Sequence, residues 1–327
     1  MTNQKLFITG GSGYVGRNLI RHFVSEGWEA VALARSETSA ETVRQLGAAA
    51  VMGDLASPTL VADMAGCSAL VHAAADTNHG FGTKVQADTN VEGTRRVLEA
   101  ARRAGIARVV VISTESVLLD GKPLINANES QPFPRRPAGE YTRSKGAAEK
   151  LALAMSAPGF EVMAVRPRMV WGRDDTTALP QLLGMARAGQ LAWIDGGTYL
   201  SSSTHVANLC AGVALALDKG RGGEAYFITD GAPLPFKTLI RDMLETQGVA
   251  VSDKSVPRAL LRVMAGVGDF LASVTGGRIK MPLTLQAYAT SAVEVTVDIS
   301  KARRELGYAP VISREKGLAE MRAGRNA

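Results

Sequence analysis

The segment that most constrains the fold lies near the start of the chain, at residues 9–16 (TGGSGYVG). The apolar run at residues 5–8 predicts a strand before it, and residues 17–24 predict a helix after it, because their apolar residues recur at helical spacing. A turn without Cβ atoms lets the backbone approach a phosphate, and the following helix presents free N–H groups and the positive end of its dipole. Gly10, Gly13 and Gly16 have the spacing of a dinucleotide-binding fingerprint, so the segment predicts a pyrophosphate site.

Short apolar strands alternate with helices through the first half of the chain. Strands are expected at residues 28–34, 48–52, 69–75, 108–113 and 161–166, and helices at about 38–47, after Ser57-Pro58, and at about 83–104 and 139–156. This alternation predicts an α/β fold with a parallel, doubly wound sheet, the Rossmann architecture.

The alternation loosens after Pro167, although a helix is expected at 207–217 and a further strand at 225–229. We therefore expect a dinucleotide-binding Rossmann domain made of residues 1–170 and about 199–230. Residues of about 171–198 and 231–327 are expected to form a smaller, interleaved C-terminal region that binds the substrate.

Composition excludes several classes of function. The net charge of +6 is spread over arginine pairs without the interleaved aromatic residues of a nucleic-acid surface, so no nucleic-acid partner is expected. Cys67 and Cys210 stand alone, which predicts neither a metal site nor a disulfide and suits a reducing compartment. We expect a cytoplasmic protein, since no segment is typical of a signal peptide and no apolar stretch suffices to span a bilayer.

Tyr141 and Lys145 carry the clearest chemical signal. They lie four residues apart in an expected helix and so share one face. A neighbouring ammonium favours the phenolate, so Lys145 is expected to lower the pKa of Tyr141 and make it a general acid or base. Thr114 directly follows the fifth strand, where ligands bind in open α/β sheets, and is expected to hold a substrate oxygen.

The end of the second strand indicates which cofactor is bound. An acidic residue there accepts a hydrogen bond from the ribose 2′-hydroxyl of NAD, whereas a nearby arginine accommodates the 2′-phosphate of NADP. The strand ends at Ala34 and is followed by Arg35 and Ser36, with no carboxylate. The sequence therefore predicts that NADP(H) is preferred over NAD(H), with Arg35 binding the phosphate.

Taken together, these residues resemble the extended short-chain dehydrogenase/reductase family over nearly the whole chain. The matching motifs are residues 9–16, Asp54-Leu55, His72-Ala73-Ala74, residues 90–94, Ser113-Thr114, Tyr141 with Lys145, and residues 166–172, 205–209 and 298–308. The resemblance implies that hydride passes between nicotinamide C4 and a carbon bearing the substrate oxygen. Tyr141 would move the proton, Lys145 would bind the ribose, and Thr114 would hold the substrate oxygen.

The resemblance also implies a set of cofactor-binding residues and a homodimer built on the helices at about 83–104 and 139–156. No metal is implied. The residues expected at the cofactor are Gly10, Ser12, Gly13, Tyr14, Val15, Gly16, Arg35, Asp54, Leu55, Ala73, Ala74, Ala75, Ser113, Tyr141, Lys145, Pro167, Met169 and Val170.

Three subclasses of the family compete. Sugar-nucleotide dehydratases carry an Asp-Glu pair after the threonine, where this chain has Glu115 and Ser116. Epimerases place an arginine before the late histidine element, and residues 199–204 contain none. Asn208 and the tail from Val256 look most like 3β-hydroxysteroid dehydrogenase-like and dihydroflavonol-reductase-like enzymes.

We therefore expect an NADP(H)-dependent oxidoreductase acting on a hydrophobic, steroid-like or polycyclic secondary alcohol or ketone. A sugar-nucleotide epimerase that retains NAD is the alternative within enzymes. A non-catalytic NADP-sensing protein on the same fold is the alternative from another class.

The segment 256–274 leaves three interpretations open. Arg258, Arg262, Asp269 and Ser273 share one side at helical spacing, and apolar residues occupy most of the rest. Such a helix is compatible with covering an apolar pocket, lying on a membrane surface as a peripheral contact, or packing in the core of the smaller region.

Overall fold

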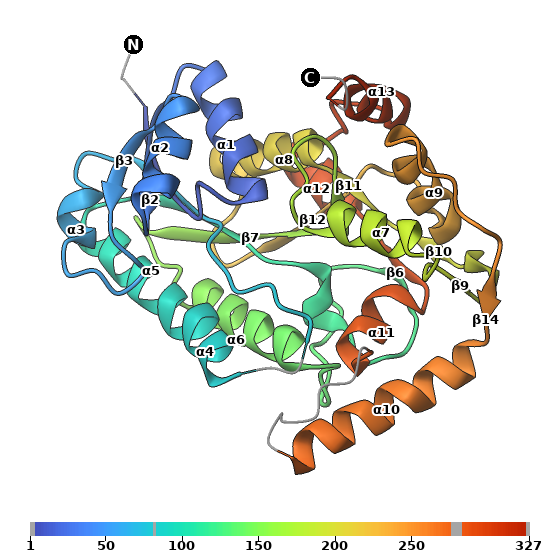
Figure 1. Ribbon diagram of the computed structural model, residues 1–327. Helices are drawn as coiled ribbons and strands as arrows, with labels where there is room; N and C mark the ends of the chain where they lie inside the picture. Colours follow the sequence, from blue (N-terminus) through green and yellow to red (C-terminus); the bar gives the residue numbers. More distant parts are fainter. Residues whose placement is uncertain (1–3, 81–82, 276–282, 325–327) are drawn as a thin grey trace.

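The centre of the fold is a seven-stranded sheet in the order β12-β7-β5-β4-β1-β2-β3. The computed structural model describes residues 4–80, 83–275 and 283–324 (Figure 1). All neighbouring strands of this sheet pair in parallel, which confirms the predicted doubly wound Rossmann sheet. The strands are β1 (Lys5–Thr9), β2 (Glu29–Ala34), β3 (Ala49–Met52), β4 (Ala69–His72), β5 (Arg108–Ile112), β7 (Glu161–Pro167) and β12 (Ala225–Ile228).

Strand β1 lies at the point where the strand order reverses. Leu6 pairs with Ala30 of β2 on one side and with Ala69 of β4 on the other. The carboxyl ends of β1 and β4 therefore meet at a topological switch point, the usual ligand position in such sheets.

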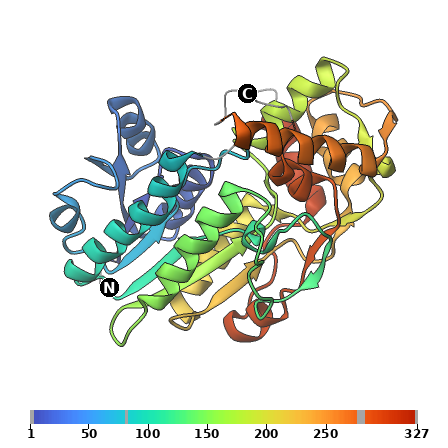
Figure 2. The same ribbon diagram turned by 90° about the horizontal axis from the view of Figure 1, so that it is seen from below.

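Alternate residues of each strand supply the cores on the two faces of the sheet. Leu6 and Ile8 pack with α1 (Tyr14–Ser25), α2 (Glu37–Gln45) and α8 (Val206–Lys219). Phe7 points to the opposite face, where it packs with α3 (Leu60–Asp63) and α5 (Gly93–Arg103). Helix α6 (Glu140–Ala154) packs beside α5 on that second face (Figures 1 and 2).

The long helix expected at about 83–104 is interrupted. It consists of α4 (Lys84–Ala87), a π-helical turn η1 (Asp88–Glu92) and α5. The turn directs Asn90 inward, where its side-chain amide donates to Asp76 O (3.0 Å) and Ser144 Oγ (3.0 Å) and accepts from the Asp76 N–H (2.8 Å). Such π turns occur frequently at functional sites, and here the turn joins the loop after β4 to the helix that carries Lys145.

The later chain builds smaller sheets and helices beside the carboxyl ends of the main strands. A four-stranded sheet has the order β13-β10-β15-β6, and two-stranded sheets pair β11 with β8 and β14 with β9. The boundaries between a Rossmann domain and a smaller C-terminal region, which we predict from the sequence, stay a prediction. The elements are η2 (Glu115–Leu118), β6 (Leu124–Ala127), β8 (Val170–Trp171), α7 (Ala178–Arg187), β9 (Trp193–Ile194), η3 (Asp195–Gly197), β10 (Leu200–Ser201), β11 (Thr204–His205), β13 (Leu234–Pro235), α9 (Phe236–Thr246), β14 (Ser255–Val256), α10 (Arg258–Val274), α11 (Leu285–Ser291), β15 (Val295–Val297), α12 (Ser300–Leu306) and α13 (Arg314–Gly324). Among the described residues, no helix is both long enough and apolar enough to cross a bilayer.

Candidate active site

The glycine loop between β1 and α1 leaves no room for side chains. Gly10 has a positive φ of 72°, and a Cβ there would lie 2.7 Å from the backbone nitrogen of Ala74. A Cβ on Gly16 would overlap the Gly10 carbonyl oxygen. Gly13 precedes α1 without capping it through a side chain, so the first-turn N–H groups of the helix are not bonded by its N-cap. This cradle fits a pyrophosphate, because backbone donors and the helix dipole face one small concavity.

The floor of this loop is fixed by a buried histidine. His72 Nδ1 is hydrogen-bonded to Thr9 Oγ1 (2.7 Å), and Nε2 to Thr94 Oγ1 (3.0 Å). Burial and the nearby Lys145 ammonium lower the pKa of His72 to about 3, so the ring stays neutral and structural. The expected strand through residue 75 ends at His72, and Ala73–Ala75 instead form a loop that starts against Gly10.

The ends of β2 and β3 carry the residues expected at the adenosine end of the cofactor. The Gly53 N–H donates to Ala34 O (2.9 Å), which places Arg35 and Asp54 on adjacent strand ends. The Asp54 carboxylate accepts from the Ala56 N–H (2.8 Å). The Arg35 side chain is exposed and has no ion-pair or hydrogen-bond partner among the described residues, so it is free to meet a phosphate.

Tyr141, Lys145 and Thr114 come together where α6 crosses the end of β5. Tyr141 is only 8% exposed. The Lys145 ammonium donates to Ile112 O at the end of β5 (2.7 Å), and Thr114 follows two residues later. The residues that were expected to act together therefore lie at one strand end, beside β4 and the glycine loop.

The expected effect of Lys145 on Tyr141 is wrong for the chain alone. Burial, assisted by the Glu115 carboxylate, raises the pKa of Tyr141 well above its usual value, and a hydrogen bond with Thr114 opposes this shift. Burial lowers the pKa of Lys145 to about 8, against the raising effect of the Glu149 carboxylate. Burial is the largest cause of both pKa shifts, and the spacing of the two residues in the sequence does not show how deeply they are buried.

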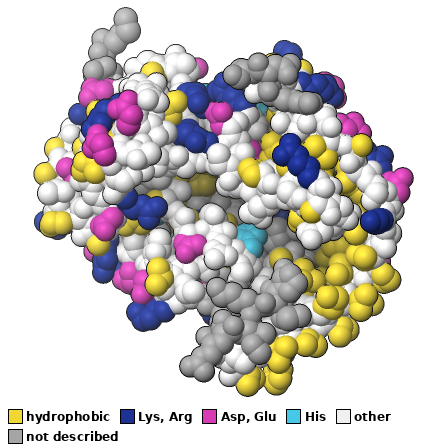
Figure 3. All heavy atoms as spheres, viewed as in Figure 1, with side chains coloured by type: hydrophobic (Ala, Val, Ile, Leu, Met, Phe, Trp, Pro, Cys, Tyr) yellow, Lys and Arg dark blue, Asp and Glu magenta, His cyan; other side chains and the backbone are white. Residues whose placement is uncertain are grey.

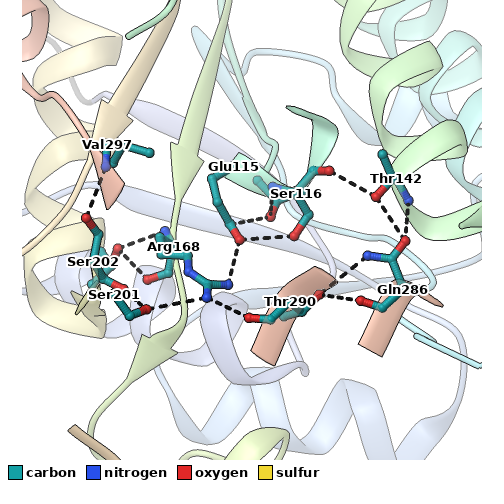
Figure 4. A network of polar contacts seen from close by, with 11 residues as sticks. Glu115, Ser116, Thr142, Arg168, Ser201, Ser202, Gln286, Thr290 and Val297 are labelled. Carbon is teal, nitrogen blue, oxygen red and sulfur yellow. Dashed lines mark hydrogen bonds and ion pairs between the residues drawn. The ribbon is translucent and has the colours of Figure 1, made fainter. Parts of the chain in front are cut away.

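Glu115 and Arg168 form a buried ion pair next to Thr114 (Figure 4). Both side chains are about 2% exposed, and Arg168 Nη1 lies 2.8 Å from Glu115 Oε1. The Thr114 hydroxyl donates to Glu115 Oε2 (2.8 Å) and accepts from the Ser116 N–H (3.1 Å). The carboxylate therefore sets the orientation of the hydroxyl that was expected to hold the substrate.

The same network continues to α11 (Figure 4). Arg168 Nη2 donates to Thr290 O (2.7 Å), and Gln286 Oε1 accepts from the Thr142 hydroxyl (2.9 Å) and N–H (3.1 Å). Thr142 follows Tyr141 directly, so α11 fixes the start of the helix that carries the phenol.

Ser113 faces a second buried ion pair. Its hydroxyl donates to Glu149 Oε2 (2.5 Å), and Glu149 Oε1 lies 2.5 Å from Arg166 Nη2.

A cavity of about 520 Å³ also borders Glu149, Arg166 and Lys301, and none of Thr114, Tyr141 and Lys145 lines it. This cavity is therefore distinct from the site described above.

The turn after β7 holds the remaining residues expected at the cofactor. Pro167 ends β7, and Val170 begins β8, which pairs with β11. Met169 between them has a positive φ of 43°, a conformation that non-glycine residues rarely adopt. Strained backbone of this kind clusters at ligand sites, and here it lies at the carboxyl end of a central strand.

Sequence reasoning missed three contributors to the site. The ring of His79 packs on Tyr141 with 4.6 Å between centroids, and Arg168 and Gln286 bond to the residues beside Thr114 and Tyr141. No local sequence motif indicates which residues these three contact. Gln286, for example, lies 144 residues from its partner Thr142. His205 accepts from the Ala207 N–H at the start of α8 (3.2 Å) and packs on Trp171, so its contacts are those of a structural residue.

Comparison with known proteins identifies the family. The model of the 3-beta hydroxysteroid dehydrogenase/isomerase family matches residues 7–258, a span that contains the glycine loop, Thr114, Tyr141 and Lys145. The chain belongs to this family. It is an oxidoreductase of the short-chain type, and the family depends on a nicotinamide cofactor.

Relatives of this 3-beta hydroxysteroid dehydrogenase/isomerase family member match it over almost their whole length. A 4-hydroxy-2-methyl-3-oxo-4-farnesyl-3,4-dihydroquinoline-1-oxide ketoreductase of Stigmatella aurantiaca is 44% identical, over 97% of this chain and 96% of the relative. A decarboxylating sterol-4-alpha-carboxylate 3-dehydrogenase of Dictyostelium discoideum is 30% identical, over 97% of this chain and 100% of the relative. A dTDP-glucose 4,6-dehydratase of Streptomyces venezuelae, solved with NAD, shares the fold with a TM-score of 0.75 at 24% identity, over 98% of this chain and 96% of that one.

Proposed function

We propose that this chain is an NADP(H)-dependent ketoreductase or alcohol dehydrogenase for a hydrophobic, steroid-like or polycyclic secondary alcohol or ketone. The observation that carries this proposal is the convergence of Tyr141, Thr114 and Lys145 at the end of β5, beside the glycine loop. The names of the two relatives describe a farnesyl-bearing ketone and a sterol, which supports an apolar substrate class.

Each residue has a defined task in this proposal. NADP(H), when bound, supplies or accepts the hydride. Tyr141 stays protonated at neutral pH because its pKa is raised, so it is ready to donate a proton to the oxygen of a ketone. To hold that oxygen, Thr114 would turn its hydroxyl proton from the Glu115 carboxylate to the ketone, and Lys145 would bind the ribose hydroxyls with its ammonium.

Arg35→Ala is expected to weaken NADP(H) binding by about 10- to 150-fold, because a charge-assisted hydrogen bond to the 2′-phosphate is worth about 1.5–3 kcal/mol. NAD(H) binding should change little, since it lacks that phosphate. Titration of both cofactors by nicotinamide fluorescence measures the two affinities. Arg96→Ala, at another exposed arginine, is the matched control. A wild-type preference for NAD(H) would contradict the proposal and favour the NAD-retaining epimerase alternative.

We expect the pH dependence of cofactor use to follow the loss of the ammonium charge of Lys145. Its pKa is lowered from 10.5 to about 8, so the ammonium is present below about pH 8 and is lost as the pH rises through that value. We expect kcat/KM for the cofactor to fall roughly tenfold per pH unit above about pH 8, because this constant reports the free enzyme. Lys145→Arg should move the decline to higher pH, since guanidinium remains charged. A flat profile up to pH 10 in the wild type would rule out this role.

A further inference from the structure

Helix α10 turns its bulky apolar side chains away from the protein. Leu260, Val263, Met264, Val267, Phe270 and Val274 are between 38% and 69% exposed. They recur at intervals of three and four residues, so they form one stripe along a helix of about 25 Å. Figure 3 shows hydrophobic side chains gathered over the part of the surface where Figure 1 places α10.

The opposite side of α10 is firmly attached to the protein. Ala265 and Ala272 are buried on that side. Arg258 donates to Ala292 O (2.7 Å), and the Asp269 carboxylate accepts from the Leu285 N–H at the start of α11 (3.1 Å). The helix therefore buries its alanines and exposes most of its large apolar residues, although Leu261 is half-buried against the core.

We propose that the exposed stripe of α10 docks on an anionic lipid surface. An apolar stripe of this length marks an interaction site, and a helix with one apolar and one polar side can lie in the plane of a bilayer interface. The charges near the stripe complement anionic lipid: Lys254 and Arg262 are cationic, Arg258 is already paired with Asp195, and the one acidic residue between 254 and 274 is Asp269, whose carboxylate is turned toward α11. Arg262 is exposed and has no ion-pair partner among the described residues.

The position of α10 favours lipid over a second copy of the chain. The homodimer that the family resemblance implies would use the helices around α5 and α6, and both views place these helices apart from α10 (Figures 1 and 2). Dimerisation there leaves the stripe of α10 uncovered. The stripe therefore needs a different occupant, and a bilayer supplies an apolar interior beneath an anionic surface.

Docking through α10 would also bring the active site to the lipid, a consequence that rests on the proposed function. Helix α11 connects the two, because Leu285 bonds to Asp269 of α10 and Gln286 bonds to Thr142 beside Tyr141. Thr284 donates to His79 O (2.8 Å), and the His79 ring packs on Tyr141. A hydrophobic substrate dissolved in a membrane would then reach the site without crossing water.

The test is flotation of the full chain with vesicles of phosphatidylcholine alone and of phosphatidylcholine with phosphatidylglycerol. We expect binding to the anionic vesicles that weakens with added salt. The double variant Val267→Glu/Phe270→Glu should lower binding by more than about tenfold, since two apolar side chains no longer enter the lipid. Val85→Glu and Val311→Glu, at exposed valines elsewhere, should bind like the wild type.

Two further measurements separate the outcomes. The absence of vesicle binding by the wild type, or unchanged binding by the double variant, would overturn the proposal. Light scattering gives the second outcome. If the wild type is a dimer that does not bind vesicles and the double variant is a monomer, the stripe contacts a second copy of the chain and the lipid proposal is overturned. Turnover of a small, water-soluble ketone should be equal in the wild type and the double variant, so a failure of docking is distinguishable from a failure of the proposed function.

Discussion

Tyr141→Phe is expected to lower kcat for ketone reduction by about a hundredfold to ten-thousandfold, the range typical of removing a general acid. Cofactor affinity should stay within about threefold of the wild type. The phenylalanine ring keeps the packing on His79, so only the hydroxyl is lost. Absorbance of the reduced nicotinamide measures turnover, and fluorescence titration measures cofactor affinity.

Tyr226→Phe is the matched control for this variant. Tyr226 is also a buried tyrosine, but it lies on β12 and its hydroxyl bonds to Arg221 N (3.0 Å) and Glu305 Oε2 (3.3 Å), away from Thr114 and Lys145. Its removal should change stability without changing kcat. Retention of more than about a tenth of the wild-type kcat by Tyr141→Phe would mean that another group supplies the proton.

The fold and the outline of the site follow from local patterns in the sequence. Strand β1, the glycine loop and α1 are specified by adjacent residues, and the parallel pairing of the sheet follows from the alternation of strands with helices. Tyr141 and Lys145 share a helix face because helical spacing requires it. Arg35 and Thr114 follow strands that end close to where their apolar runs stop, whereas β4 ends at His72 although its small apolar residues continue to Ala75.

The energetics of the site depend on contacts that no local pattern contains. The pKa of Tyr141 is set by burial and by Glu115, and burial is a property of the assembled fold. Glu115 and Arg168 are separated by 53 residues, and the sequence around each of them does not indicate that they form an ion pair. Periodicity alone also left open whether α10 packs in the core, because it does not fix which side of a helix faces outward.

Arg168→Met is expected to lower the free energy of unfolding by about 3–5 kcal/mol, the usual cost of leaving one charge of a buried pair without its partner. Arg168 is 2% exposed and bonds to both Glu115 and Thr290 O. Without it, the donors left to the Glu115 carboxylate within the described part of the chain are the hydroxyls of Thr114 and Ser116. Chemical denaturation monitored by circular dichroism measures the loss. Arg44→Met, at the exposed pair with Glu37, should leave the free energy of unfolding nearly unchanged.

The double variant Glu115→Gln/Arg168→Met separates the effect of this ion pair on stability from its effect on activity. It removes both charges, so most of the stability lost in Arg168→Met should return, and the double-mutant cycle gives the coupling between the two side chains. A double variant no more stable than Arg168→Met would contradict the view that an uncompensated carboxylate causes the loss. Activity should behave differently, because Thr114 donates to the Glu115 carboxylate. Loss of the carboxylate changes the orientation of the Thr114 hydroxyl, so we expect kcat to stay low in the double variant even where stability recovers.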